Sequence, residues 1–85
     1  MNRPKVSAES LLRAMRIINK KLAQAMNAKG PGILVNQHET LGILTEEYHE
    51  LVMAVRRGHS EDIVGELADI AVCAIWGIAS REETR

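Results

Sequence analysis

The chain has 85 residues, and eleven Lys and Arg balance eleven Asp and Glu, so its formal net charge is zero at pH 7. A chain of this length forms one small domain, and without a basic excess it is not expected to bind nucleic acid through a global positive field. Apolar residues make up 46% of the chain but aromatic residues only 2%, which predicts an aliphatic core.

The sequence predicts neither a targeting segment nor a membrane span. The basic N-terminus is not followed by an apolar h-region. The longest apolar run, residues 70–79, is too short to cross a bilayer. The single cysteine, Cys73, excludes an internal disulfide and is expected to be a small buried hydrophobe. We therefore expect a cytoplasmic protein that binds no membrane.

The first expected helix follows a flexible arm of residues 1–6 and runs from about Ser7 to about Ala28. Ser7 is the expected N-cap, because its hydroxyl can accept a hydrogen bond from the first turn. Apolar residues at helical spacing form one stripe along this segment. A linker is expected over residues 29–35, since it contains the sequence Gly30-Pro31-Gly32, which no helix crosses.

The second helix is expected to begin near Asn36 and to end at Arg57. Asn36 and Glu39 have the spacing of a capping box, in which Glu39 reaches back to the backbone of Asn36. Gly58 is the expected C-cap.

The third helix is expected to have Ser60 as its N-cap and to run to about Ser80, with residues 81–85 as a tail. The short connection at Gly58 predicts that the second and third helices form an antiparallel hairpin. The expected fold is therefore all-α, with three helices in a single domain of residues 1–85.

Acidic side chains occur where the third helix has little polar surface. Glu66 and Asp69 lie three residues apart on a helix that is apolar in nearly every direction, and such a helix is normally buried. Glu47 and Glu50 have the same spacing beside the apolar stripe of the second helix. In an antiparallel hairpin the two pairs can face each other at similar heights.

Four carboxylates in a sheltered site repel one another unless they are protonated, paired with cations or bound to a metal. A set of oxygen ligands suits Mg²⁺ or Mn²⁺, which can also bind a polyphosphate. The alternative is a solvated acidic face, which we would favour for Glu46, Glu47 and Glu50 taken alone. It is a weaker interpretation for Glu66 and Asp69, because buried acids almost always have partners.

The pattern Glu46-Glu47-x-x-Glu50, followed after fifteen residues by Glu66-x-x-Asp69, resembles the all-α nucleoside triphosphate pyrophosphatases of the MazG-like superfamily. The resemblance implies a Mg²⁺-dependent hydrolase that converts a nucleoside triphosphate to the monophosphate and pyrophosphate, clearing non-standard or excess nucleotides. It implies Glu47, Glu50, Glu66 and Asp69 as metal ligands, with Glu47 also orienting or deprotonating the attacking water.

The resemblance further implies that the hairpins pair between subunits into a four-helix bundle, giving a homodimer or a homotetramer. This agrees with an apolar third helix that a lone short chain would struggle to cover.

Several other residues are candidates for contacts with the substrate. Arg81 and Arg85, or Lys20 and Lys21 from a partner subunit, could contact phosphate, although exposed cations are usually only solvated. Trp76 could stack on a base, although a core or interface role is favoured. Phosphoribosyl-ATP pyrophosphohydrolases usually carry a Lys before the first motif, where this chain has Leu44 and Thr45, and this difference counts against that branch of the superfamily. A different class stays open: a non-catalytic helical oligomerisation or nucleotide-binding module that keeps the acidic motifs.

Overall fold

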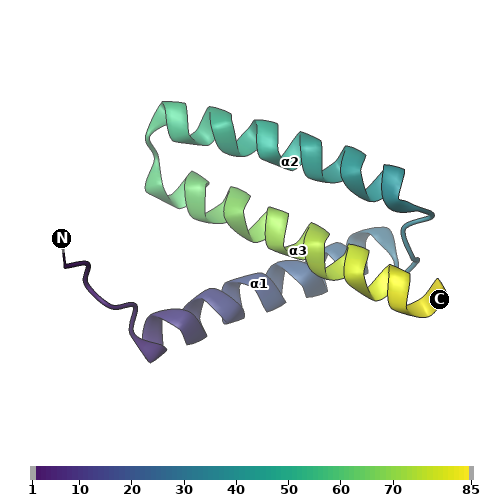
Figure 1. Cartoon of the computed structure of the whole chain (residues 1–85), viewed down its shortest axis with the longest axis horizontal. Coiled ribbons are helices and arrows are strands. Elements are labelled where there is room, and N and C mark those ends of the chain that lie inside the picture. The colour runs from purple at the N-terminus through teal and green to yellow at the C-terminus, as the bar shows by residue number, and fades with distance from the viewer. Residues whose placement is uncertain (1, 85) are drawn as a thin grey trace.

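Three helices make up the fold in a computed structural model that describes residues 2–84. Helix α1 spans Ala8–Lys29, α2 spans Gln37–Arg57 and α3 spans Ser60–Thr84. Figure 1 shows α2 and α3 side by side and antiparallel, with α1 crossing the other side of α3. Within the described residues, α3 packs on both other helices, and α1 and α2 do not pack on each other. The predicted all-α fold and the hairpin are thus confirmed.

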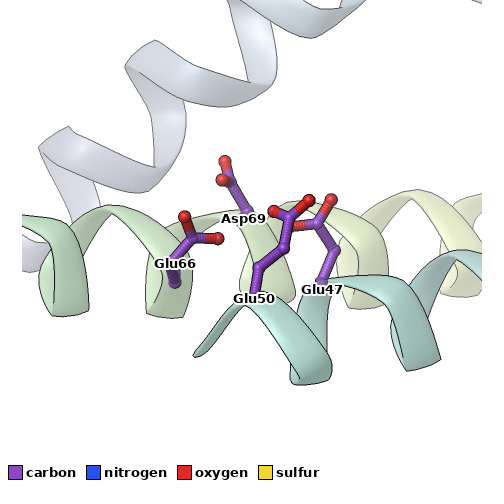
Figure 2. Close-up of side chains that lie close together, drawn as sticks. All are labelled: Glu47, Glu50, Glu66 and Asp69. Carbon is purple, nitrogen blue, oxygen red and sulfur yellow. The ribbon is translucent and has the colours of Figure 1, made fainter. Parts of the chain in front are cut away.

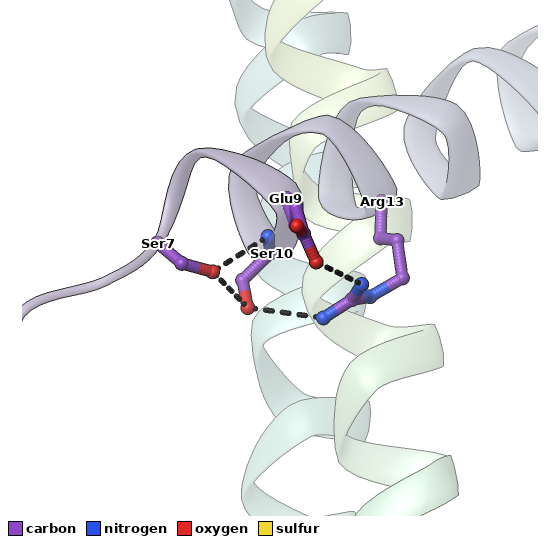
Figure 3. Close-up of polar contacts among 4 residues, drawn as sticks. All are labelled: Ser7, Glu9, Ser10 and Arg13. Carbon is purple, nitrogen blue, oxygen red and sulfur yellow. Dashed lines mark hydrogen bonds and ion pairs between the residues drawn. The ribbon is translucent and has the colours of Figure 1, made fainter.

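The start of α1 is stabilised by a network of polar side chains (Figure 3). The backbone amide of Ser10 donates to the Ser7 hydroxyl at 3.1 Å, which confirms Ser7 as the N-cap. Arg13 donates to the Ser10 hydroxyl at 3.2 Å and lies 4.0 Å from Glu9. The helix continues to Lys29, one residue past its expected end.

Helix α2 has the caps expected from the sequence, with one difference. The Asn36 side chain accepts hydrogen bonds from the amides of His38 and Glu39, and Gly58 ends the helix in the left-handed conformation at φ 75°. The capping box is not reciprocal as predicted, because Glu39 accepts from the amide of Val35 at 2.8 Å instead of from Asn36. The extended backbone at Asn36 leaves the preceding amide within reach of this carboxylate.

Two predictions for α3 were wrong. Ser60 is the first helical residue and not the N-cap, since the amide of Ile63 donates to the carbonyl of His59 at 3.1 Å. Residues 81–84 belong to the helix and not to a tail, because this stretch contains no helix breaker. The hydroxyl of Thr84 donates to the carbonyl of Ser80 at 3.0 Å in this last turn. Arg85, which completes the expected tail, lies outside the described residues.

The buried core of the chain is small. Its buried hydrophobic residues, among those described, are Ala54, Ala68, Val72 and Cys73. The apolar stripe predicted for α2 is largely uncovered, since Leu41 is 60% exposed and Tyr48 is 62% exposed. The single chain therefore leaves much of its apolar surface open to solvent.

Helix α3 is long and apolar enough to cross a membrane, judged by length and composition. The core helix of a soluble protein passes the same test. In this fold α3 is the central helix, and it carries the carboxylates of Glu66 and Asp69 against its neighbours.

Close packing between α2 and α3 requires a glycine at position 77. A Cβ atom at Gly77 would lie 2.8 Å from Cγ2 of Thr40, whereas a Cβ at Gly42 would meet nothing within 4 Å. Both glycines are helical, so they differ in the space around them and not in secondary structure.

We expect Gly77→Ala to lower the free energy of unfolding by about 1 kcal/mol, because overpacking outweighs the gain in helix propensity. The matched change Gly42→Ala should raise it by up to about 1 kcal/mol. Urea denaturation of the two variants tests this difference in sign. Adding Thr40→Ala, which removes the clashing methyl group, should make Gly77→Ala neutral or stabilising; a destabilisation that persists would contradict the packing argument.

Candidate metal centre

Four carboxylates from α2 and α3 converge at the middle of the hairpin. Each of Glu47, Glu50, Glu66 and Asp69 offers an oxygen, and these atoms all lie within 4.8 Å of one another. Figure 2 shows Glu47 and Glu50 rising from α2 toward Glu66 and Asp69 on α3.

The turn of the hairpin explains this convergence. Gly58 is equally far along the chain from Glu50 and Glu66, and equally far from Glu47 and Asp69. Because both helices rise equally per residue, each α2 carboxylate is brought level with one on α3. The facing arrangement expected from the sequence is present.

The cluster is partly sheltered from solvent. Glu47, Glu66 and Asp69 are half-buried, whereas Glu50 is exposed. The Oε2 atoms of Glu47 and Glu66 are buried and have no hydrogen-bond partner among the described residues. Buried polar oxygens without partners are uncommon, and an ion is one way to satisfy them. The alternative of a solvated acidic face was considered for Glu46, Glu47 and Glu50. It fits Glu46, which is exposed and lies outside the cluster.

Burial and mutual repulsion disfavour the ionised forms of two of these acids. The pKa of Glu47 is raised above its ordinary value of 4.5, first by burial and then by the charges of Glu50, Asp69 and Glu66. The pKa of Glu66 is also raised, first by burial and then by a hydrogen bond with Glu50 and by nearby negative charge. Ionising these carboxylates together is therefore unfavourable, and a bound cation would relieve the repulsion.

Two lysines of the same chain reach toward the cluster from α1. Lys21 Nζ lies 2.9 Å from Oδ1 of Asp69, in an ion pair that is also a hydrogen bond. The charge of Lys29, at the end of α1, lowers the pKa of Glu47 and so opposes part of the rise. From the sequence, Lys21 was expected only at the site of a partner subunit, and Lys29 was not among the predicted residues. The signal that could have found Lys29 is a cation in the last turn of a helix.

We expect the metal-free protein to lose stability as pH rises. The unfolded state ionises Glu47 and Glu66 near 4.5, while the folded state retains these protons to higher pH. The stabilisation is therefore complete below pH 4.5 and is lost as pH rises through the raised folded pKa values.

Urea denaturation in chelator, from pH 4.5 upward, measures this loss as a falling free energy of unfolding. Glu47→Gln should flatten the fall, because glutamine does not titrate, whereas Glu46→Gln should leave it unchanged. If the free energy of unfolding falls with pH equally steeply in Glu47→Gln and in the unsubstituted protein, the raised pKa assigned to Glu47 is contradicted.

A cavity of about 330 Å³ lies beside the cluster. It is lined by Glu47 and Asp69 and by apolar side chains that include Ile33, Val72 and Trp76. Lys29 also lines it. A mainly apolar hollow with charged groups at one edge is typical of a site for a small organic ligand.

The linker between α1 and α2 closes part of this cavity. The indole Nε1 of Trp76 donates to the carbonyl of Gly32 at 2.8 Å. The amide of Leu34 donates to the Ser80 hydroxyl at 2.9 Å, and this hydroxyl donates to the carbonyl of Trp76 at 2.8 Å. These contacts fix the linker to α3, and Gly32 and Leu34 become part of the cavity wall.

The other predicted residues take different positions. Lys20 is exposed, and Arg81 lies in a separate groove between α2 and α3 with Leu41 and Ile78. Trp76 is half-buried at the cavity, and Cys73 is buried in its wall as expected. The pKa of the Cys73 thiol is raised by burial and by the charge of Glu47, so this thiol is not activated as a nucleophile.

The donor set suits a hard divalent cation. All four side chains offer carboxylate oxygen, and no His or Cys belongs to this cluster among the described residues. Mg²⁺ and Mn²⁺ prefer such oxygen ligands, and either would satisfy the buried Oε2 atoms of Glu47 and Glu66.

Comparisons of the chain with protein-family models, curated proteins and solved structures gave no match. The resemblance to the MazG-like superfamily therefore stays a prediction from the acidic motifs.

Proposed function

We propose that this protein is a Mg²⁺-dependent hydrolase that converts a nucleoside triphosphate to the monophosphate and pyrophosphate. The proposal depends above all on the four carboxylates, whose oxygens lie within 4.8 Å of one another. Two of their oxygens are buried without a partner. Mn²⁺, with the same ligand preferences, would serve as an alternative ion.

In this proposal Glu50, Glu66 and Asp69 hold the ion, and Glu47 both contacts it and accepts the proton of the attacking water. A bound Mg²⁺ would supply Lewis-acid chemistry, lowering the pKa of water and neutralising phosphate charge. The Glu47 carboxylate lies within the cluster, where it can accept a proton from a water held there. The water oxygen forms a new bond to the α-phosphorus while the bond from that phosphorus to the α–β bridging oxygen breaks. The products are the nucleoside monophosphate and pyrophosphate, and Glu47 takes up the proton of the water.

The cavity beside the cluster supports a nucleoside as the organic part of the substrate. Its volume of about 330 Å³ is within the range of small-molecule sites, about 300–1,000 Å³. Trp76 presents an aromatic ring at its wall, and Lys29 places a cation near Glu47. A base would occupy the apolar part while the phosphates extend toward the carboxylates.

We further propose that a second copy of the chain covers the open face of α2 and α3, completing a four-helix bundle. The solvent-accessible area is 6920 Å², well above the roughly 5,000 Å² expected for a folded monomer of this mass. Leu41, Tyr48 and Ile78 are each at least 60% exposed.

Sedimentation of the protein should show a dimer or tetramer. Tyr48→Lys should shift the oligomeric state toward monomer.

The deciding experiment measures pyrophosphate release from a panel of NTPs and dNTPs, with and without Mg²⁺. Metal-dependent formation of monophosphate and pyrophosphate supports the enzyme. Failure to turn over any nucleotide, combined with thermal stabilisation by nucleotide, would identify a binding module instead. Release of inorganic phosphate in place of pyrophosphate would contradict the proposed cleavage site.

A further inference from the structure

Lys21 of α1 forms an ion pair with the acidic cluster of the same chain. Its ammonium lies 2.9 Å from Oδ1 of Asp69, and both side chains are only 34% exposed. Among the described residues, it is the only ion pair in which one of the four clustered carboxylates takes part. The neighbouring Lys20 is exposed and takes no part in it.

The ammonium of Lys21 also lies beside Gly65 of α3. A Cβ built at Gly65 would lie 3.7 Å from Lys21 Nζ, which is an ordinary contact distance. Gly65 lies one turn before Asp69 and next to Glu66. The same ammonium lowers the pKa of Glu66, so its charge acts on more of the cluster than its direct partner.

One ammonium neutralises only part of the charge of four carboxylates. A divalent cation held by the same oxygens would neutralise more of it, but it would also repel an ammonium bound to one of its ligands. The two cations cannot share Asp69 without this repulsion. A lysine on a flexible stem, about one-third exposed, can move away at a small cost.

We propose that Lys21 is the resident counter-ion of the cluster and that it exchanges with the divalent ion at Asp69. The displaced ammonium then contacts the substrate's phosphates at the edge of the site and helps to hold the substrate there. This inference rests on the proposed function. Lysine is well suited to the second role, because its ammonium binds phosphate as a mobile point charge.

Calorimetric titration of the full-length protein with Mg²⁺ alone, without nucleotide, tests the exchange. Lys21→Met should bind Mg²⁺ about 5- to 10-fold more tightly than the unsubstituted protein, because a competing charge is gone. Lys20→Met removes the same charge from the same helix and should change the affinity far less. Lys21→Arg, which keeps a cation opposite Asp69, should not gain affinity.

A second titration tests the phosphate contact with inorganic pyrophosphate at saturating Mg²⁺. Lys21→Met should bind pyrophosphate several-fold more weakly than Lys20→Met does. Unchanged or weaker Mg²⁺ binding in Lys21→Met overturns the exchange and leaves the proposed function standing. If the unsubstituted protein binds neither Mg²⁺ nor Mn²⁺, the proposed function falls and the exchange with it.

Discussion

Asp69→Asn is expected to reduce Mg²⁺-dependent pyrophosphate release by about 100-fold or more. The change keeps the size of the side chain but removes one of the four negative charges that lie within 4.8 Å of one another. Glu50→Gln should have a similar effect, and because Glu50 is exposed it should do so with little change in stability. Initial rates at saturating Mg²⁺ give the measurement.

Glu46→Gln provides a matched control for these carboxylate variants. Glu46 is next to Glu47 in the chain but is exposed and outside the cluster. It should therefore retain nearly full activity. Equal losses in Glu46→Gln and Glu50→Gln would mean that general acidity of α2, and not the cluster, supports turnover.

Mg²⁺ is expected to stabilise the folded protein strongly. A ligand at about 100 times its dissociation constant adds about 2.7 kcal/mol to the free energy of unfolding. For a domain of this size, each 1 kcal/mol raises Tm by about 4–8 °C, so the total rise should be about 10–20 °C. Thermal unfolding followed by circular dichroism measures it, and excess chelator should reverse it.

Glu47→Gln separates the two roles of the Glu47 charge, which are repulsion of the other carboxylates without metal and binding of the metal when it is present. Without metal it should raise Tm, because it removes a half-buried acid whose ionised form is disfavoured. With Mg²⁺ it should show little further rise, because a ligand is lost. A full Mg²⁺-induced rise in this variant would place the ion elsewhere on the protein.

The hairpin and its carboxylates could be predicted because their determinants are local. Gly58 ends α2 in the left-handed conformation, and because the turn is short, α3 runs back antiparallel along α2. Helical spacing then decides which carboxylates face across the pair. Glu66 and Asp69 attracted attention because an apolar helix offers acids few solvated positions.

The role of α1 could not be predicted in the same way. Its position depends on how the linker after Lys29 is fixed to α3 through Trp76 and Ser80, and these contacts join residues far apart in sequence. The pairing of Lys21 with Asp69 and the cavity beside Glu47 both follow from that position. The end of α3 was also missed, because residues 81–84 carry no stop signal.

The symmetric placement of the carboxylates about Gly58 limits how this hairpin can vary in length. One residue inserted between Glu50 and the turn would rotate Glu47 and Glu50 by about 100° around α2 and lift them by about 1.5 Å. A compensating insertion in α3 would restore their height but turn the second pair as well. Related chains that keep the site can therefore lengthen or shorten its arms only in whole turns, and in both arms together.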